Sequence, residues 1–313
     1  MYNIETFIER RQLHIYNRQF SFGNRMKQIR NAINVGLQKN CWNISFSDDS
    51  KIIKLSAAQN NINKDKDYSF IEKLNQDDSS IFLRISNIIK IIPEFDPEQN
   101  DQKVVNNIIE EYVKCMFNFN YNFNTVDIER LGLKSSDYLC VHIRSGDIFD
   151  TSPLGQVHSS YVQPPYDFYR LIIDLPKYKD VPVVLIAEDT ANPVINKLLR
   201  NYPNIIFKKR SLLQDQEIIL NAKRLVYGVG TFIPELIKLS KKSKKMIEWS
   251  FTDGRTEKNT ILLKTLTTEK KIFVKDYLEE GWKCTAKQCD TMLNFKLKNH
   301  CTFSKLEELL KDF

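Results

Sequence analysis

A cluster of residues suited to holding an anion stands at positions 142–147. These residues are His-Ile-Arg-Ser-Gly-Asp and directly follow the apolar stretch 138–141. Arg144 carries a planar, permanently charged guanidinium that can grip a diphosphate through two parallel hydrogen bonds. The same charge would stabilise a diphosphate as it leaves. Gly146 lets the backbone turn or approach a ligand closely, and Asp147 supplies a carboxylate for proton transfer.

Two other stretches offer groups of the same kind. Gly23-Asn24-Arg25 precedes a segment with helical spacing, and Gly230-Thr231-Phe232 begins another. A helix N-terminus presents unpaired N–H groups and the positive end of its dipole, which favours phosphate binding. Asn24 could add a hydrogen bond and Thr231 a hydroxyl, although Thr231 could equally be a plain helix cap.

Carboxylates stand after the predicted strands as well. Asp189 follows the apolar run 181–187 and could accept hydrogen bonds from a nucleoside base or ribose, or simply cap the next helix. Asp147 is the nearest candidate for a general base and Asp150 the next, but either could instead neutralise an arginine. His142 could contact a ligand or be a packed strand residue.

Regular elements must position these residues, and strands and helices alternate along most of the chain. Apolar spacing predicts helices over 26–38, 103–119, 161–175, 192–203, 214–225 and 231–240. Strands are expected at 14–20, 41–47, 138–144, 181–190, 204–210, 226–230 and 244–250. Asn192 and Pro193 have the residue types of a helix cap and first helical position. This alternation indicates an α/β fold with a parallel sheet and helices on both faces.

Parallel sheets bind ligands beyond the carboxyl ends of their strands, at a switch point in strand order. The candidate residues all follow predicted strands, so we expect them to gather at that edge. Residues 255–313 lose the alternation. There, 271–282 is expected to pack across the sheet edge, and 303–313 to form a closing amphipathic helix.

The stretch His142-Ile-Arg144-Ser-Gly146-Asp147 resembles the His-x-Arg-x-Gly-Asp signature of the α1,2-, α1,6- and protein O-fucosyltransferase superfamily. Phe22-Gly23-Asn24-Arg25 resembles the N-terminal loop of that group, and Gly230-Thr231-Phe232 its C-terminal Ser/Thr-Phe motif. The order and approximate separation of the three stretches agree, and the resemblance covers about residues 15–250. One glycine of the familiar Gly-x-Gly-Asn loop is absent, because Ser21 stands in its place.

The resemblance implies a GT-B-like fold, in which two Rossmann-like domains with parallel sheets face a cleft. It implies inverting transfer of fucose from GDP-fucose to a glycan or glycoconjugate, with no metal or other cofactor. Arg144 would then hold the donor β-phosphate, and Asp189 would contact guanine or ribose. The remaining donor-binding positions would be Gly23, Asn24, Arg25, His142, Gly146, Thr231 and Phe232. The alternatives are another nucleotide-sugar transferase of this fold, or a non-catalytic protein that binds nucleotides or glycans.

We expect three parts in the chain. Residues 1–135 would form an N-terminal Rossmann-like domain on the acceptor side, and 136–254 a C-terminal Rossmann-like domain that binds the GDP-sugar. Residues 255–313 would be an extension that packs back on the domains. Polar and aromatic residues after the signature could shape the acceptor site: Gln156, His158, Tyr161, Gln163, Pro164 and Pro165.

The net charge of +7 includes the run Lys-Leu-Ser-Lys-Lys-Ser-Lys-Lys at 238–245. Such a run could bind phosphates, nucleic acid or a membrane surface, but most runs of this length are solvated helix ends. No nucleic-acid recognition motif accompanies it, so we expect no nucleic-acid partner. No stretch approaches the ~20 apolar residues that a membrane span needs. The protein would be cytoplasmic if the chain is complete, or lumenal in the Golgi or endoplasmic reticulum if an anchor was removed.

Six cysteines are present. Cys41, Cys115 and Cys140 are far apart in apolar surroundings, which is typical of buried free thiols. Cys284, Cys289 and Cys301 cluster near the C-terminus, where zinc binding with His300 or a disulfide are both open, although the spacing is wide for zinc.

Overall fold

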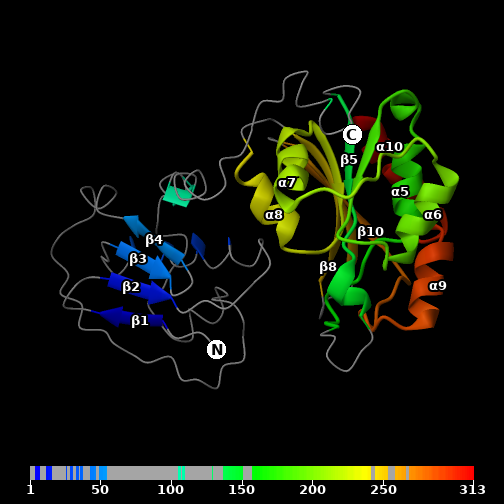
Figure 1. Cartoon of the computed structure of the whole chain (residues 1–313). Helices are drawn as coiled ribbons and strands as arrows, with labels where there is room; N and C mark the ends of the chain where they lie inside the picture. The colour runs from blue at the N-terminus through cyan, green and yellow to red at the C-terminus, as the bar shows by residue number, and fades with distance from the viewer. Residues whose placement is uncertain are drawn as a thin grey trace. The chain divides into compact units, whose positions relative to one another are not determined.

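The computed structural model describes residues 137–150, 157–240, 244–252, 258–265 and 268–313, together with segments 4–7, 12–15, 43–46 and 49–54 and single helical positions at 26–37, 105–109 and 129. The chain divides into two compact units (Figure 1). One comprises Met1–Phe119 and Thr231–Leu239, and the other Asn120–Gly230 and Ser240–Phe313. The domain boundaries expected at 135 and 254 stay a prediction.

The first unit contains a four-stranded sheet in the order β1-β2-β3-β4. Its strands are β1 (Ile4–Phe7), β2 (Gln12–Ile15), β3 (Asn43–Phe46) and β4 (Asp49–Lys54). β2 and β3 are parallel, and the helical positions between them bury Met26, Ile29, Ile33 and Leu37, which confirms the helical spacing in this segment. The short helix α8 (Phe232–Ile237) belongs to this unit, where Glu235 pairs with Arg30 at 3.4 Å.

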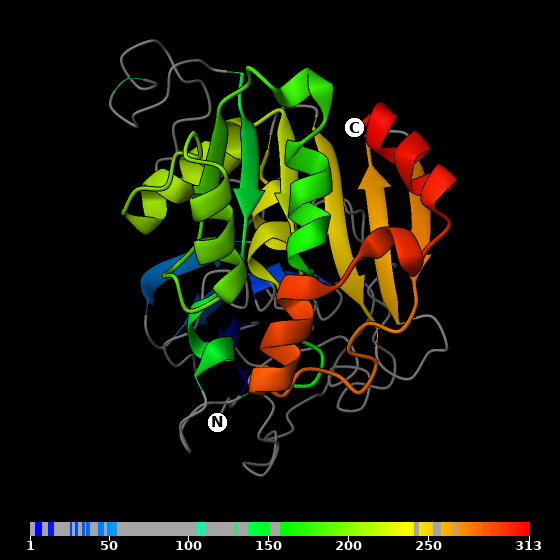
Figure 2. The ribbon, with the colours of Figure 1, turned by 90° about the vertical axis from the view of Figure 1, so that its right-hand side faces the viewer.

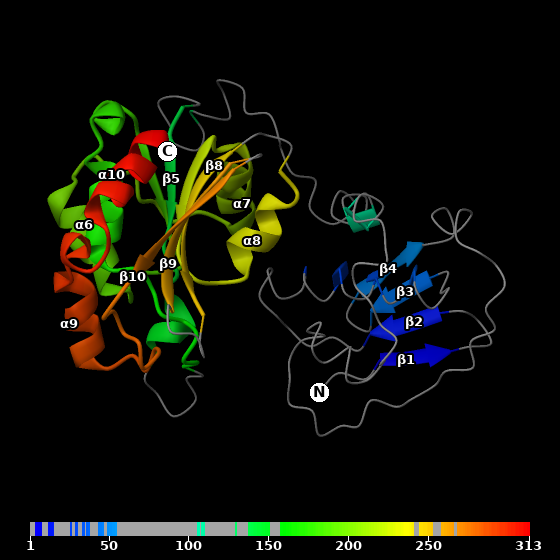
Figure 3. The same ribbon diagram turned by 180° about the vertical axis from the view of Figure 1, so that it is seen from behind.

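The second unit contains a six-stranded mixed sheet in the order β10-β9-β8-β7-β5-β6. Its strands are β5 (Leu139–His142), β6 (Val183–Ile186), β7 (Arg224–Tyr227), β8 (Lys245–Phe251), β9 (Asn259–Lys264) and β10 (Glu269–Val274). β6, β5, β7 and β8 are parallel, as the alternation predicted. β9 and β10 extend the sheet as antiparallel strands, which Figure 3 shows beyond β8.

The strand predicted at 204–210 is reduced to one parallel bridge between Ile206 and Val184. The polar residues Lys208–Arg210 follow it directly, so too few apolar side chains are available to extend a buried edge strand. Within residues 259–274, β9 and β10 pair in the same sheet as the parallel strands.

Helices cover both faces of this sheet (Figures 1 and 2). On one face lie α5 (Tyr166–Ile173), α6 (Pro193–Asn201), α9 (Ala286–Asn294) and α10 (Phe303–Asp312), and on the other lies α7 (Leu212–Asn221). The core against the four-helix face contains Leu139, Val141 and Ile143 from the β5 region. Alternation along a strand therefore turns Cys140 and His142 toward the α7 face. Among the described residues, no helix is long and apolar enough to cross a membrane.

The strand order places a switch point beside β5. The chain passes from β5 to its neighbour β6 on one side and then returns to β7 on the other side. The last residue of β5, His142, is in register with Ile186 of β6 and Tyr227 of β7. The segments after these three strands therefore leave the sheet at one common edge, where a parallel sheet binds its ligands.

Candidate functional site

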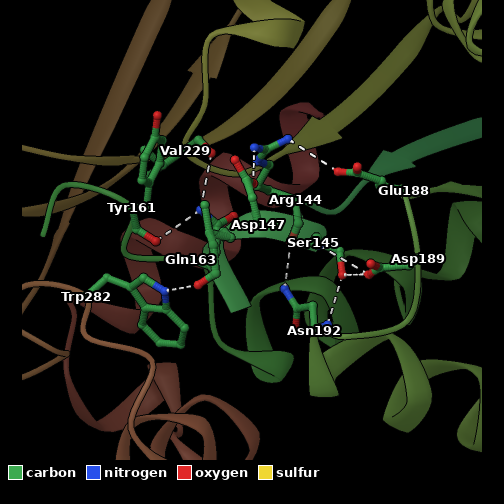
Figure 4. A network of polar contacts seen from close by, with 12 residues as sticks. Arg144, Ser145, Asp147, Tyr161, Gln163, Glu188, Asp189, Asn192, Val229 and Trp282 are labelled. Carbon is green, nitrogen blue, oxygen red and sulfur yellow. Dashed lines mark hydrogen bonds and ion pairs between the residues drawn. The ribbon is translucent and has the colours of Figure 1, made fainter. Parts of the chain in front are cut away.

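Arg144 follows β5 at this common edge, and its side chain is 24% exposed. One terminal nitrogen pairs with the Asp147 carboxylate, and the other lies 3.7 Å from Oε2 of Glu188 (Figure 4). Asp147 and Glu188 are 69% and 64% exposed, so both carboxylates face solvent. The guanidinium is thus accessible and neutralised by two exposed partners. Sequence reasoning named Arg144 and Asp147 as a possible charge pair, and the structure joins them.

The backbone beneath Arg144 is fixed by the N-terminus of α6. Asn192 caps this helix, since its Oδ1 accepts the N–H of Val194 at 3.0 Å. Its amide nitrogen donates to the carbonyl of Arg144 at 3.0 Å, and its own N–H donates to Ser145 Oγ at 2.9 Å. One predicted helix cap therefore also holds the loop that carries the guanidinium (Figure 4).

Asp189 is part of the same network rather than a free ligand group. Its Oδ1 accepts the Ser145 hydroxyl and the N–H groups of Gly146 and Ala191, the latter two at 3.2 and 2.9 Å. Burial alone would raise the pKa of Asp189, but these hydrogen bonds and the charge of Arg144 hold it below its ordinary value. The structure therefore supports the helix-entrance role that the sequence left open for Asp189, and Oδ1 is already occupied.

Gly146 is favoured here by its backbone conformation. Its φ of +68° lies in the left-handed region that L-residues rarely adopt. A Cβ at this position would also come within 2.8 Å of Cδ of Glu188, but that exposed, flexible side chain could move aside. Gly146 begins the short 3-10 helix η3 (Gly146–Phe149), which carries Asp147 next to Arg144.

His142 stands at the end of β5 on the α7 face. Burial, aided by the positive charge of Arg144, lowers its pKa to about 3. The imidazole is therefore neutral at physiological pH, and protonation would be strongly opposed. The sequence left two roles open for His142, a packed strand residue or a ligand contact. This environment fits the packed strand residue better than a group that gives a proton to a ligand.

A second loop of the site runs through residues 157–165 and is fastened to the segment after β7. The side chain of Gln163 is fully buried, and its Nε2 donates to the carbonyls of Tyr161 at 3.1 Å and Val229 at 3.2 Å. Gly228 permits this approach, because a Cβ there would come within 2.9 Å of Gln163 Oε1. Gln163 thus joins the loops that follow β5 and β7. Because its side chain is fully buried, Gln163 could shape an acceptor site only through the loops that it joins, and that expectation stays a prediction.

The structure describes the other candidate residues to different extents. Tyr161 is partly exposed and its ring lies edge-on to that of His158, with centroids 6.1 Å apart. Gln156, like Gly23, Asn24 and Arg25, lies outside the described residues. Thr231 occupies the N-cap position of α8 without a side-chain capping bond, and Phe232 is the first residue of that helix. Both belong to the first unit, so their predicted role toward the donor stays a prediction.

The basic run contributes to the fold. Lys244 is buried, and its ammonium donates to the carbonyls of Ile219 and Leu220, 2.8 and 2.9 Å away, and to that of Ala222 at the end of α7. Lys238 pairs with Glu235, and Lys245 donates to the carbonyl of Asp312. Three of the five lysines of this run are therefore engaged in contacts within the protein, and of these Lys244 is buried.

The described cysteines are free thiols. Cys140 is completely buried, as its apolar surroundings predicted. Burial and the neighbouring Cys289 thiol raise the pKa of Cys284 to about 11. Within the described part of the chain, no three His, Cys, Asp or Glu side chains gather into a group that could hold a metal ion. The expectation of metal-free chemistry stays a prediction.

Two residues of this site, Ser145 and Glu188, were not chosen from sequence. Glu188 stands beside Asp189 after the same strand, so strand-end position alone could not rank one above the other. Ser145 lies inside the signature, where its type gives no sign that it meets Asp189 and Asn192. The chain matches no protein-family profile and no curated protein. The functional argument therefore rests on the site geometry and on the sequence signature at residues 142–147.

Proposed function

We propose that this chain is an inverting glycosyltransferase that transfers fucose from GDP-fucose to a hydroxyl of a glycan or glycoconjugate, without a metal ion, on a GT-B-like arrangement of two Rossmann-like domains. The observation that carries the proposal is the position of Arg144. Its guanidinium is partly exposed at the switch point of a parallel sheet, beside a left-handed glycine. Resemblance to the fucosyltransferase signature supplies the choice of fucose and guanine.

The present partners of Arg144 do not oppose this role. Asp147 and Glu188 are both largely exposed, and ion pairs of such groups contribute only about 0–1 kcal/mol. A diphosphate offers more negative charge and two oxygens in the geometry that a guanidinium prefers. It would therefore displace the carboxylates at little cost. Because the backbone of Arg144 is held by Asn192, the side chain would keep its place during this exchange.

The proposed reaction is a direct displacement at the anomeric carbon of fucose. The acceptor oxygen attacks this carbon from the face opposite the diphosphate, while its proton passes to a base. The bond between the carbon and the β-phosphate oxygen breaks, and GDP leaves with the electron pair. Arg144 would stabilise the charge that accumulates on the leaving oxygen.

The role of Asp147 follows from this geometry. A base for inverting transfer must lie on the face of the sugar opposite the leaving group. Asp147 contacts the guanidinium that would hold the leaving group. In this proposal Asp147 is a counter-ion that the donor displaces, and we prefer this role to that of the general base. Gly23, Asn24, Arg25, Thr231 and Phe232 remain predicted donor contacts, and no step depends on them.

Thermal unfolding with GDP, GDP-fucose, GDP-mannose, UDP and a UDP-sugar tests the donor class. A ligand at about 100 times its dissociation constant adds about 2.7 kcal/mol of stability, which is a clear shift. We expect a shift with the guanine nucleotides alone. No shift with any nucleotide would remove the proposal, and a shift with UDP alone would replace guanine with uracil. Release of GDP in the presence of glycan acceptors then separates a transferase from a protein that only binds.

Arg144→Ala tests the central residue, and Arg200→Ala is its matched control. Arg200 carries the same charge on the exposed last turn of α6, away from the capped end that touches the site. We expect Arg144→Ala to abolish GDP binding, and Arg144→Lys to be nearly as poor because an ammonium lacks the paired donors. Full GDP affinity in Arg144→Ala would contradict the assignment.

A further inference from the structure

An unusual stretch of backbone follows β10. Asp276, Leu278 and Cys284 have φ values of +57°, +43° and +53°, and Gly281 has +82°. In the part of the chain that the structure describes, the first three are the only non-glycine residues with positive φ. Such conformations persist where surrounding contacts over-determine them, and they cluster at functional sites. We call residues 276–284 the brace segment.

Several hydrogen bonds hold the brace segment in shape. Gln288 of α9 donates its Nε2 to the carbonyl of Gly281 at 2.7 Å, while its Oε1 accepts the N–H of Lys283 at 2.8 Å. The N–H of Asp276 donates to Glu279 Oε1 at 3.0 Å, and Asn259 of β9 donates to the carbonyl of Tyr277. The segment is thus anchored to the sheet at one end and to α9 at the other.

The brace segment supports the loop after β5 through Trp282, which is 1% exposed. Its indole N–H donates to the carbonyl of Ile148 at 2.8 Å, within η3, and its backbone N–H donates to the carbonyl of Ser159 at 2.8 Å. Its ring packs edge-on against Phe149, with centroids 5.2 Å apart. Gly281 allows this close approach, because a Cβ there would come within 2.9 Å of the Ser159 carbonyl oxygen.

Tyr277 provides a second support. Its hydroxyl is buried and donates to the carbonyl of Gln163 at 2.7 Å. Gln163 in turn holds Val229 after β7. The brace segment therefore reaches both loops at the switch point. Trp282 supports the turn that carries Asp147 (Figure 4), and Tyr277 supports the clamp to the neighbouring loop.

We propose that the brace segment sets the position of the loops that bind the donor, and that Trp282 is a positioning residue of this site. Trp282 acts through the carbonyls of Ile148 and Ser159 and touches no ligand. The ligand in this inference rests on the proposed function, whereas the support of the loops does not. The role also accounts for the strained backbone, since residues 276–284 follow a path set by the loops they hold.

Trp282→Phe tests the inference, because it keeps an aromatic ring and removes the indole N–H. Trp249→Phe is the matched control: Trp249 is also fully buried in this unit, none of the described residues accepts a hydrogen bond from its Nε1, and a phenylalanine ring can keep its edge-on contact with Tyr277, whose ring centroid lies 5.2 Å away. Tyr277→Phe is a second variant that removes only a hydroxyl, should Trp282→Phe fold poorly. Each protein is compared in hydrogen exchange of peptides covering 146–150 and 157–165, and in its dissociation constant for GDP.

We expect Trp282→Phe to speed exchange in these two peptides by about fivefold or more, as loss of one buried hydrogen bond implies. Tyr277→Phe should act mainly on 157–165. Trp249→Phe should leave both peptides unchanged relative to the rest of the sheet. The dissociation constant for GDP should rise about fivefold in Trp282→Phe and stay within about twofold in Trp249→Phe.

The hydrogen-exchange and GDP-binding measurements together separate this inference from the proposed function. If the wild-type protein binds no GDP, the proposed function fails and exchange alone decides on the brace segment. If wild type binds GDP and Trp282→Phe binds it equally well, Trp282 does not position the site. Exchange that rises equally across the whole unit in Trp282→Phe and Trp249→Phe would overturn the support of the loops.

Discussion

Acidification from about pH 6.5 to about pH 4.5 should remove stability through His142, an effect that Asp215 opposes. The pKa of this imidazole is lowered to about 3 by burial and by Arg144, whereas an unfolded histidine has a pKa of about 6.5. Between these two values the unfolded chain binds a proton that the folded chain does not. Stability is therefore complete above about pH 6.5 and is lost as the pH falls, by at most about 1.4 kcal/mol per pH unit. Over the stated interval the loss is about 2 kcal/mol.

Asp215 provides a contribution of opposite sign in the same interval. Burial raises its pKa to about 6, and the nearby Arg210 only partly offsets this effect. Its folded pKa lies above its unfolded one, so protonation favours the folded state as the pH falls from about 6 to about 4. Over the stated interval this gain is about 2 kcal/mol, so it nearly cancels the His142 loss in the wild-type protein. His142→Asn should therefore become more stable on acidification, while Asp215→Asn should lose about 2 kcal/mol.

Urea unfolding at several pH values, followed by tryptophan fluorescence, measures these slopes. Trp249 and Trp282 are both buried in the unit that contains His142, so their emission reports its unfolding. For each protein we compare how its free energy of unfolding changes with pH. Any pH-independent loss of stability caused by the substitution itself cancels in this comparison. Equal changes in wild type and His142→Asn would refute the reasoning. An NMR titration of the four histidines should also show one that stays neutral below about pH 5.

Two further substitutions test the scaffold. Asn192→Ala should lose about 1–2 kcal/mol of unfolding free energy, because it removes the helix cap. Asn192→Asp keeps the capping oxygen and loses only the amide that donates to the Arg144 carbonyl. Its unfolding free energy should therefore stay close to that of wild type, while its GDP binding weakens. Denaturant unfolding and GDP titration of the pair separate the two roles, and equal stability in all three proteins would exclude the cap. Lys244→Met should lose about 1–3 kcal/mol in denaturant unfolding, because it removes the ammonium that donates to the carbonyls of Ile219, Leu220 and Ala222 at the end of α7. A loss below about 1 kcal/mol would mean that water replaces the ammonium.

Local signals in the sequence were sufficient for several elements. The helix predicted at 192–203 is α6, capped by Asn192, begun by Pro193 and ended at Tyr202. The residues that define it are neighbours in the chain, so tertiary contacts need not be known. The same holds for β5 and β6, whose continuous apolar runs are typical of buried parallel strands. Their carboxyl ends located Arg144 and Asp147 correctly at one edge.

The local pairing of β8, β9 and β10 escaped prediction, although Asp253-Gly254, a common hairpin pair, stands between β8 and β9 in the sequence. Features set by distant contacts escaped prediction as well. Gln163 has the residue type of a ligand contact, yet its position beneath Gly228 makes it a clamp. Asp189 is satisfied by Ser145, 44 positions away. Burial and partners of this kind depend on how separate loops meet.

The indole bond of Trp282 also has a consequence for how the protein is made. It joins residues 134 positions apart, and the Tyr277 bond joins residues 114 apart. Contacts of such long sequence separation form late, since a large loop must close before they add any stability. On a ribosome, β5 to β8 would emerge well before residues 276–284. We therefore expect a stalled nascent chain to pair these strands while the loops at the switch point still lack the support of Trp282 and Tyr277.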